Sequence, residues 1–128
     1  MKICIDTNIY TACKKGDTEI LGFLEEADEV LVPSVVLGEL YAGFYIGKLR
    51  AKNIGELEEF LDVPGIHVVE INKSIAEKYG YLIKALRDRG TPIPTNDVWI
   101  AATALESSAK ILSLDKHFDY IPGIINVL

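Results

Sequence analysis

The chain has 128 residues, of which 49% are hydrophobic and 25% are charged. These proportions exclude an intrinsically disordered chain, and the length suits one domain, residues 1–128, with a single buried core. A formal net charge of −6 excludes a protein that holds nucleic acid through a broad basic surface, although divalent ions bound in a cleft would still allow nucleic acid as a substrate.

Short runs rich in β-branched residues alternate along the chain with longer runs of helical period. In chain order, the pattern predicts a strand at 2–5, helices at 8–13 and 18–27, a strand at 29–33, helices at 34–46 and 53–62, a strand at 66–71, helices at 73–89 and 97–107, and strands at 110–114 and 124–128. Ser34, Asn72 and Asn96 stand where a short polar side chain can cap a helix. The alternation predicts an α/β fold, a three-layer α/β/α sandwich with a central, mostly parallel sheet of about five strands.

Two acidic residues directly follow predicted strands. The segment "KICID" ends in Asp6, and "KILSLD" ends in Asp115. Because ligands bind beyond the carboxyl ends of parallel strands, both carboxylates are expected at one edge of the sheet. A turn-forming or helix-capping aspartate explains either residue alone. Two such residues at one edge favour a functional site.

Glu39 lies in "SVVLGELYAGFY", a predicted helix with little polar circumference. A glutamate that faces solvent is the ordinary interpretation. The surrounding apolar residues leave little room for a polar face, and an ionised carboxylate among them is unfavourable unless a cation or hydrogen bonds compensate its charge. We therefore treat Glu39 as a third candidate for the site.

Asp97 opens the apolar run "DVWIAATAL". Asn96 is a competent helix cap, so capping does not require Asp97, although the helix dipole favours an acid in the first turn by about 0.3–1 kcal/mol. On a helix, Asp97 shares a face with Ala101 and Ala104, whose small side chains suit close packing on a sheet. The carboxylate is then expected to point toward the other acids.

Four carboxylates at one edge repel each other unless a cation lies among them. A ligand set made only of oxygens suits hard ions, so Mg²⁺ or Mn²⁺ is expected, and Ca²⁺ less so. Such ions activate a water and stabilise the attacking and leaving oxygens in phosphoryl chemistry. The spacing therefore predicts metal-dependent hydrolysis of a phosphate ester, without identifying the ester.

Other features of the sequence limit the location and the kind of metal site. No apolar run approaches the roughly 18 residues of a membrane span, and the first ten residues lack a secretory signal, so a cytoplasmic location is expected. The two cysteines, Cys4 and Cys13, and the two histidines, His67 and His117, do not form a set for a tetrahedral metal site, so free thiols are expected.

Four segments together resemble a known family. "ICIDTNIY", "VPSVVLGELYAG", "NDVWIAATAL" and "ILSLDKHFDYIPGI" occur in the order and spacing of the PIN domain, most closely the VapC toxins of toxin–antitoxin pairs. The resemblance extends from Ile3 to Ile124. It implies Mg²⁺- or Mn²⁺-dependent cleavage of single-stranded RNA. The catalytic and metal-binding acids that it implies are Asp6, Glu39, Asp97 and Asp115.

The same resemblance implies supporting residues around the acids. Asn8 and Ser113 match the polar partners that hold the acids or waters in place, and Ser113 stands where threonine is more usual. Asp119 lies one helical turn beyond Asp115 and is a candidate reserve acid or an acid that supports the metal-binding ones from outside. An exposed acid in a solvated turn is the alternative for Asp119.

The resemblance also implies a homodimer and a small antitoxin protein that covers the acidic site. The helix at 34–46 carries more aromatic surface than one core-facing stripe requires, which favours a partner-binding surface there, with plain core packing as the alternative. Three basic groups are candidates for tracking the RNA backbone, although solvated helix ends explain them equally well: Lys14 with Lys15, Lys48 with Arg50 and Lys52, and Arg87 with Arg89.

Three other functions are consistent with parts of the pattern. A signalling receiver domain has a similar length and a parallel sheet, but it requires a pair of acids after the first strand and a lysine after the last strand, and both are missing here. A housekeeping PIN nuclease in RNA processing shares all the motifs. A catalytically inactive PIN-like module that only binds a partner is disfavoured, because all four acids are present.

Overall fold

The computed structural model describes residues 1–128. In chain order its elements are β1 (Lys2–Ile5), α1 (Thr7–Lys14), α2 (Thr18–Glu26), β2 (Glu29–Pro33), α3 (Ser34–Ile46), α4 (Arg50–Leu61), β3 (Ile66–Val69), α5 (Lys73–Asp88), α6 (Thr95–Glu106), β4 (Lys110–Leu112) and the 3₁₀ helix η1 (Lys116–Tyr120). No helix is both long enough and apolar enough to cross a bilayer.

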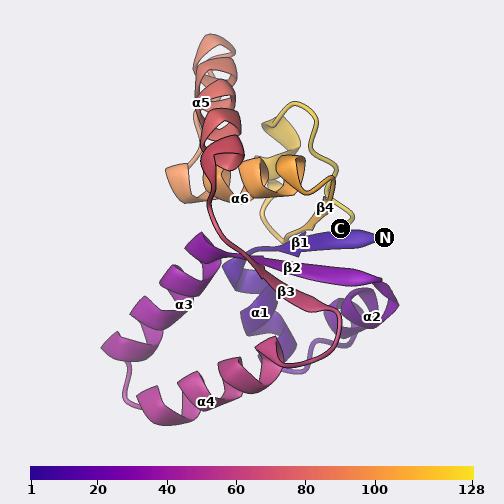
Figure 1. The fold of residues 1–128 in the computed structure, drawn as a ribbon, viewed down its shortest axis with the longest axis vertical. Helices are drawn as coiled ribbons and strands as arrows, with labels where there is room; N and C mark the ends of the chain where they lie inside the picture. The colour runs from indigo at the N-terminus through magenta and orange to yellow at the C-terminus, as the bar shows by residue number, and fades with distance from the viewer.

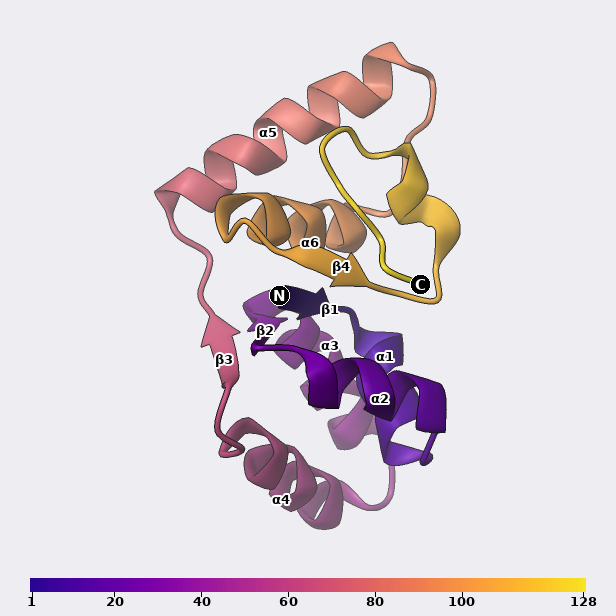
Figure 2. The same cartoon turned by 90° about the vertical axis from the view of Figure 1, so that its right-hand side faces the viewer.

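The four strands form one parallel sheet in the order β3-β2-β1-β4. Helices α5 and α6 lie on one side of this sheet, and α1, α2, α3 and α4 lie on the other (Figures 1 and 2). The predicted three-layer α/β/α sandwich is therefore confirmed. The chain runs from β1 outward to β3 and returns to place β4 on the other flank of β1, so the order reverses between β1 and β4. Ligands bind at such a switch point in open α/β sheets.

The central strand β1 anchors the core. Ile3, Cys4 and Ile5 have no exposed surface, and they belong to a cluster of 24 buried hydrophobic residues contributed by both helical layers and the sheet. Because β1 is covered on both faces, its three residues after Lys2 are all apolar instead of alternating with polar ones. The buried strand is held firmly in the core, and this fixes the position of Asp6, the residue that directly follows it.

The structure has no fifth strand at 124–128, where the sequence predicted one. This tail lies beside β4, but it contributes only an isolated bridge between Ile111 and Asn126. The Asn126 side chain takes the backbone groups that a longer ladder would use, since its Oδ1 accepts from the amides of both Ser113 and Leu128. The predicted strand at 110–114 likewise ends at Leu112.

Two of the three predicted helix caps are wrong. Asn72 does cap α5, accepting a hydrogen bond from the Ile75 amide at 2.9 Å. Ser34, in contrast, donates its hydroxyl to the Val69 carbonyl at 3.0 Å, and Pro33 occupies the cap position of α3. Helix α6 begins at Thr95 and not at Asp97, because its first turn closes on the Pro94 carbonyl, so Asn96 lies inside the helix and is exposed.

Candidate functional site

Asp6 lies at the carboxyl end of β1 and is both a helix cap and a member of the site. Its Oδ1 accepts a hydrogen bond from the Ile9 amide at 3.1 Å, which caps α1, and its Oδ2 accepts one from the Ser113 hydroxyl. The residue is only 5% exposed. Burial raises the pKa of Asp6, the nearby charges of Asp97 and Asp115 raise it further, and the two hydrogen bonds offset part of this rise.

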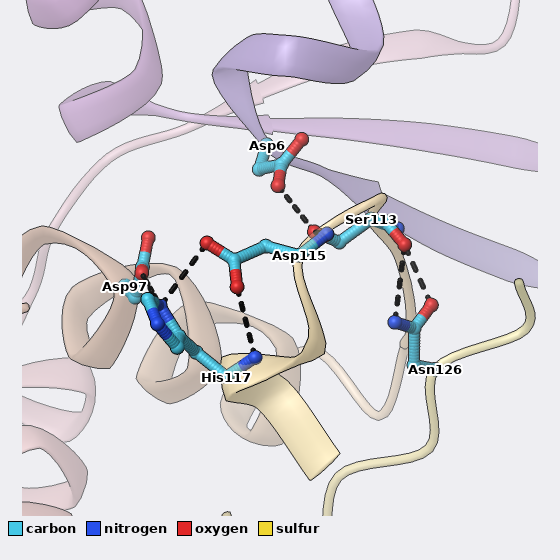
Figure 3. A network of polar contacts seen from close by, with 6 residues as sticks. All are labelled: Asp6, Asp97, Ser113, Asp115, His117 and Asn126. Carbon is cyan, nitrogen blue, oxygen red and sulfur yellow. Dashed lines mark hydrogen bonds and ion pairs between the residues drawn. The ribbon is translucent and has the colours of Figure 1, made fainter. Parts of the chain in front are cut away.

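Ser113 joins two of the acids. Its hydroxyl oxygen donates to Asp6 and accepts a hydrogen bond from the Asp115 amide at 2.9 Å (Figure 3). The Asn126 side chain holds the Ser113 backbone from the other side, accepting from its amide at 3.3 Å and donating to its carbonyl at 3.1 Å. The short C-terminal tail therefore fixes the segment that carries Asp115.

Asp97, Asp115 and His117 form the tightest group in the site. His117 Nδ1 lies 3.1 Å from Asp115 Oδ2 and 3.4 Å from Asp97 Oδ2, and the His117 amide donates to Asp115 Oδ1 at 2.9 Å (Figure 3). The potential ligand atoms of these three residues lie within 4.8 Å of one another. One metal ion could therefore contact all three side chains.

Asp97 reaches this group from the first turn of α6. Ala101 and Ala104 on the same helix are fully buried, so α6 packs closely against the sheet and directs its first turn toward the strand ends. Burial raises the pKa of Asp97, and the charges of Asp115 and Glu39 add to this effect, whereas the hydrogen bond and charge of His117 lower it. The carboxylate is 18% exposed, so solvent still reaches it.

Glu39 approaches the site from α3. The Thr7 hydroxyl donates to its Oε1 at 2.9 Å, and Thr7 directly follows Asp6. Glu39 and Asp6 are not part of the tight group of Asp97, Asp115 and His117. The charge of Glu39 nevertheless contributes to the raised pKa of Asp97, because both carboxylates lie at this end of the sheet.

Two of the predicted supporting residues lie outside the acid network. Asn8 is exposed and makes no hydrogen bond to an acid; the adjacent Thr7 makes that contact instead. Asp119 is exposed and forms no hydrogen bond or ion pair. Of the predicted supporting residues, only Ser113 contacts an acid directly.

Sequence reasoning missed Thr7, His117 and Asn126. Thr7 and His117 each lie within two residues of a candidate acid, so proximity along the chain was an available signal for both. Asn126 gives no such signal, since it reaches the site only through the pairing of the tail with β4.

The chemistry of the side chains suits a divalent cation. No lysine or arginine forms an ion pair with any of the four acids, and His117 is their only potentially cationic partner. Burial and mutual repulsion raise the pKa values of Asp6 and Asp97, as expected for carboxylates that lack a compensating charge. Carboxylate oxygens are the ligands that Mg²⁺ and Mn²⁺ prefer, and an imidazole nitrogen favours Mn²⁺ of the two.

Comparison with known sequences gives one family. The sequence model of the PIN domain matches residues 3–124. Ribonuclease VapC2 of Rickettsia felis is 29% identical over 126 residues, which cover 94% of this chain and 92% of that protein. Ribonuclease VapC2 of Haemophilus influenzae is 30% identical over 115 residues, which cover 88% of this chain and 86% of that protein.

Solved structures show the same similarity in three dimensions. The VapBC2 complex of Rickettsia felis, bound to a promoter DNA fragment, contains a chain that matches with a TM-score of 0.86 and 27% identity, covering 98% of this chain and 97% of that one. VapBC-1 of nontypeable Haemophilus influenzae matches with a TM-score of 0.87 and 25% identity, covering 98% and 96%. The similarity therefore extends over the whole fold.

Proposed function

The chain belongs to the PIN domain family, and from this premise we propose that it is an endoribonuclease that hydrolyses phosphodiester bonds in single-stranded RNA, as the toxin of a VapBC-type pair. The convergence of Asp6, Glu39, Asp97 and Asp115 at the switch point of the sheet carries the proposal. Relatives that match most of the chain are named ribonucleases, which supports RNA as the substrate.

The four acids would hold one or two divalent ions, Mg²⁺ or Mn²⁺, at the carboxyl ends of β1 and β4. Bound there, such an ion activates water and neutralises charge on the scissile phosphate. The chain itself supplies orientation: Ser113 fixes one oxygen of Asp6, and Thr7 fixes one oxygen of Glu39. Water would attack the phosphorus while the bond from phosphorus to the leaving sugar oxygen breaks, and that oxygen would take up a proton, so no side chain becomes covalently attached to the RNA.

A protein partner is part of the proposal. The related structures are VapBC complexes, which supports an antitoxin partner. We further propose that this antitoxin is small and covers the site, and that the protein is a homodimer in the cytoplasm. Tyr41 and Phe44 on α3 pack against the core, but Tyr45 and Ile46 at its far end are 56% and 87% exposed, and Leu49 in the following turn is 58% exposed. Apolar residues gathered at one exposed end of a helix suit a partner surface.

Cleavage of labelled single-stranded RNA by the purified protein tests the activity. We expect products in Mg²⁺ or Mn²⁺ and none in EDTA; cleavage that EDTA leaves unchanged would overturn the metal-dependent mechanism.

A toxin is distinguished from a housekeeping nuclease by expression in cells. If the chain is a toxin, its expression should arrest growth, and coexpression of a small DNA-binding protein encoded by a neighbouring gene should relieve the arrest. Normal growth on expression of the chain alone would favour housekeeping RNA processing.

A further inference from the structure

A hollow of about 380 Å³ opens beside the acids, between α1 and the segment that follows β4. Asn8, Thr11, Lys15 and Leu114 are among its lining residues. None of the four acids lines the hollow, but Asn8 follows Asp6 by two residues and Leu114 directly precedes Asp115. The hollow therefore borders the segments that carry two of the acids.

Lys15 brings an uncompensated positive charge to this hollow. The preceding Lys14 pairs with Glu56 on α4 at 3.2 Å, whereas Lys15 forms no ion pair. Asp17 shares the hollow, and one of its carboxylate oxygens, Oδ1, caps α2 by accepting from the amides of Glu19 and Ile20. An anion that entered the hollow would therefore meet a lysine without an ion pair and an exposed carboxylate whose charge the amino end of α2 partly offsets.

Asn8 and Lys15 lie along one face of α1. They are seven residues apart, which is nearly two helical turns and about 10 Å along the axis. Asn8 is the end nearer to the acids, and both residues are exposed. If the scissile phosphate of an RNA strand lies at the acids, the side-chain amide of Asn8 lies beside the cleavage position and the ammonium group of Lys15 lies farther along the RNA.

We propose that single-stranded RNA runs from the acid cluster along this hollow, with Asn8 contacting the nucleotide next to the scissile phosphate and Lys15 binding a phosphate farther along the strand. This proposal rests on the ribonuclease function proposed above. It makes Lys15 a substrate-positioning residue, which should act on RNA binding and not on the chemical step.

A second hollow, of about 300 Å³, offers the competing path. Arg87 and Thr95 line it, but its other lining residues are mainly apolar: Ile83, Leu86, Pro92 and Ile93. It adjoins only Asp97, through Thr95 two residues earlier. The hollow along α1 is larger and more polar and borders the segments that carry two acids, so it suits a phosphate backbone better.

The test compares Lys15→Gln with Lys110→Gln, which removes the same charge from an exposed lysine without an ion pair at the amino end of β4, the end of that strand away from the acids. With RNA of roughly 12 nucleotides, Lys15→Gln should raise KM about three- to tenfold, leave kcat unchanged, and make the negative slope of log affinity against log salt shallower by about 0.7. Lys110→Gln should change neither KM nor this slope. The effect should disappear with RNA too short to span the roughly 10 Å from Asn8 to Lys15.

Direct binding separates this proposal from the proposed function. RNA binding is followed by fluorescence anisotropy in Mg²⁺ with Asp115→Asn as the background, so that cleavage does not consume the probe. If the wild-type protein cleaves RNA but Lys15→Gln changes neither KM nor affinity, the path along α1 is wrong and the ribonuclease function stands. If Lys15→Gln weakens binding but the wild-type protein never cleaves, the function is wrong and the binding path stands. Weaker binding from Arg87→Gln alone, or an effect of Lys15→Gln on a protein partner alone, would also overturn the path.

Discussion

The Ser113 hydroxyl donates a hydrogen bond to Oδ2 of Asp6 across 107 positions of sequence, and both residues are buried. Because the same hydroxyl oxygen accepts from the Asp115 amide, one serine sets the positions of two acids that follow neighbouring strands. The acid cluster is therefore built into the sheet and does not depend on loops alone.

Ser113→Ala tests this linkage through the pH dependence of cleavage. Burial already raises the pKa of Asp6, and the bond from Ser113 opposes that rise, so its loss should raise the pKa further. The acidic limb of the pH–rate profile should move to higher pH, and the free energy of unfolding should fall by about 1–3 kcal/mol. Ser113→Thr keeps the hydroxyl and should retain the wild-type profile. An unchanged profile in the alanine variant would show that the bond does not control Asp6.

The raised pKa values of Asp6 and Asp97 predict how stability depends on pH when no metal is bound. In the unfolded chain these groups titrate near pH 4, whereas in the folded protein they hold their protons to higher pH. The folded state then binds more protons than the unfolded state in this interval. Their contribution to stability is complete below about pH 4 and is lost as pH rises through the folded pKa.

Urea unfolding in EDTA across a pH series measures this effect. Asp97→Asn should lose part of the pH dependence and should be more stable than the wild-type protein at neutral pH, because it removes one partly buried charge that lies near the charges of Asp115 and Glu39. Added Mn²⁺ should stabilise the wild-type protein more than the variant. If the variant had the same pH dependence as the wild-type protein, the ionised form of Asp97 would not be destabilised in the metal-free folded state.

Thr7→Val tests the support of Glu39. The substitution keeps the β-branched shape but removes the hydroxyl that donates to Glu39 Oε1 at 2.9 Å. Loss of such a supporting contact typically lowers metal affinity or activity about ten- to a hundredfold. Thr7→Ser, which keeps the donor, should stay near the wild-type rate. Equal rates for the valine and serine variants would remove Thr7 from the site.

His117→Ala tests whether the imidazole contributes to metal preference. His117 Nδ1 and one carboxylate oxygen each of Asp97 and Asp115 lie close enough together to bind one ion, and imidazole suits Mn²⁺ better than Mg²⁺. Calorimetric titration of the variant should show weaker Mn²⁺ binding and nearly unchanged Mg²⁺ binding. Equal losses for both ions would mean that His117 acts only by orienting the two aspartates.

The acids were predictable from sequence because strand ends place them. Asp6 directly follows β1, Asp115 lies three residues beyond the end of β4, and Asp97 lies in the first turn of α6, so the parallel topology brings these three residues to one edge. The detailed start of α6 was not predictable in this way. Asn96 has the side chain of a cap, but Pro94 sets the entry to the helix and its carbonyl accepts the first bonds.

The contacts around the acids come from segments whose sequences show no regular spacing of hydrophobic residues. His117 is brought to Asp97 by η1, a short 3₁₀ turn that hydrophobic pattern does not predict. Asn126 reaches Ser113 because the tail returns beside β4. Such side chains become visible only when distant segments are packed together.

The central claim is that the acid cluster cuts RNA, and one matched pair of variants tests it most directly. Asp97→Asn keeps the shape of a clustered side chain but removes its charge, whereas Asp119→Asn makes the same change at an exposed residue without polar contacts. Initial rates of single-stranded RNA cleavage in Mn²⁺ are measured on proteins with matched circular dichroism spectra. Asp97→Asn should lose at least about a hundredfold in rate and Asp119→Asn almost none. Cleavage by Asp97→Asn at the wild-type rate would contradict the claim.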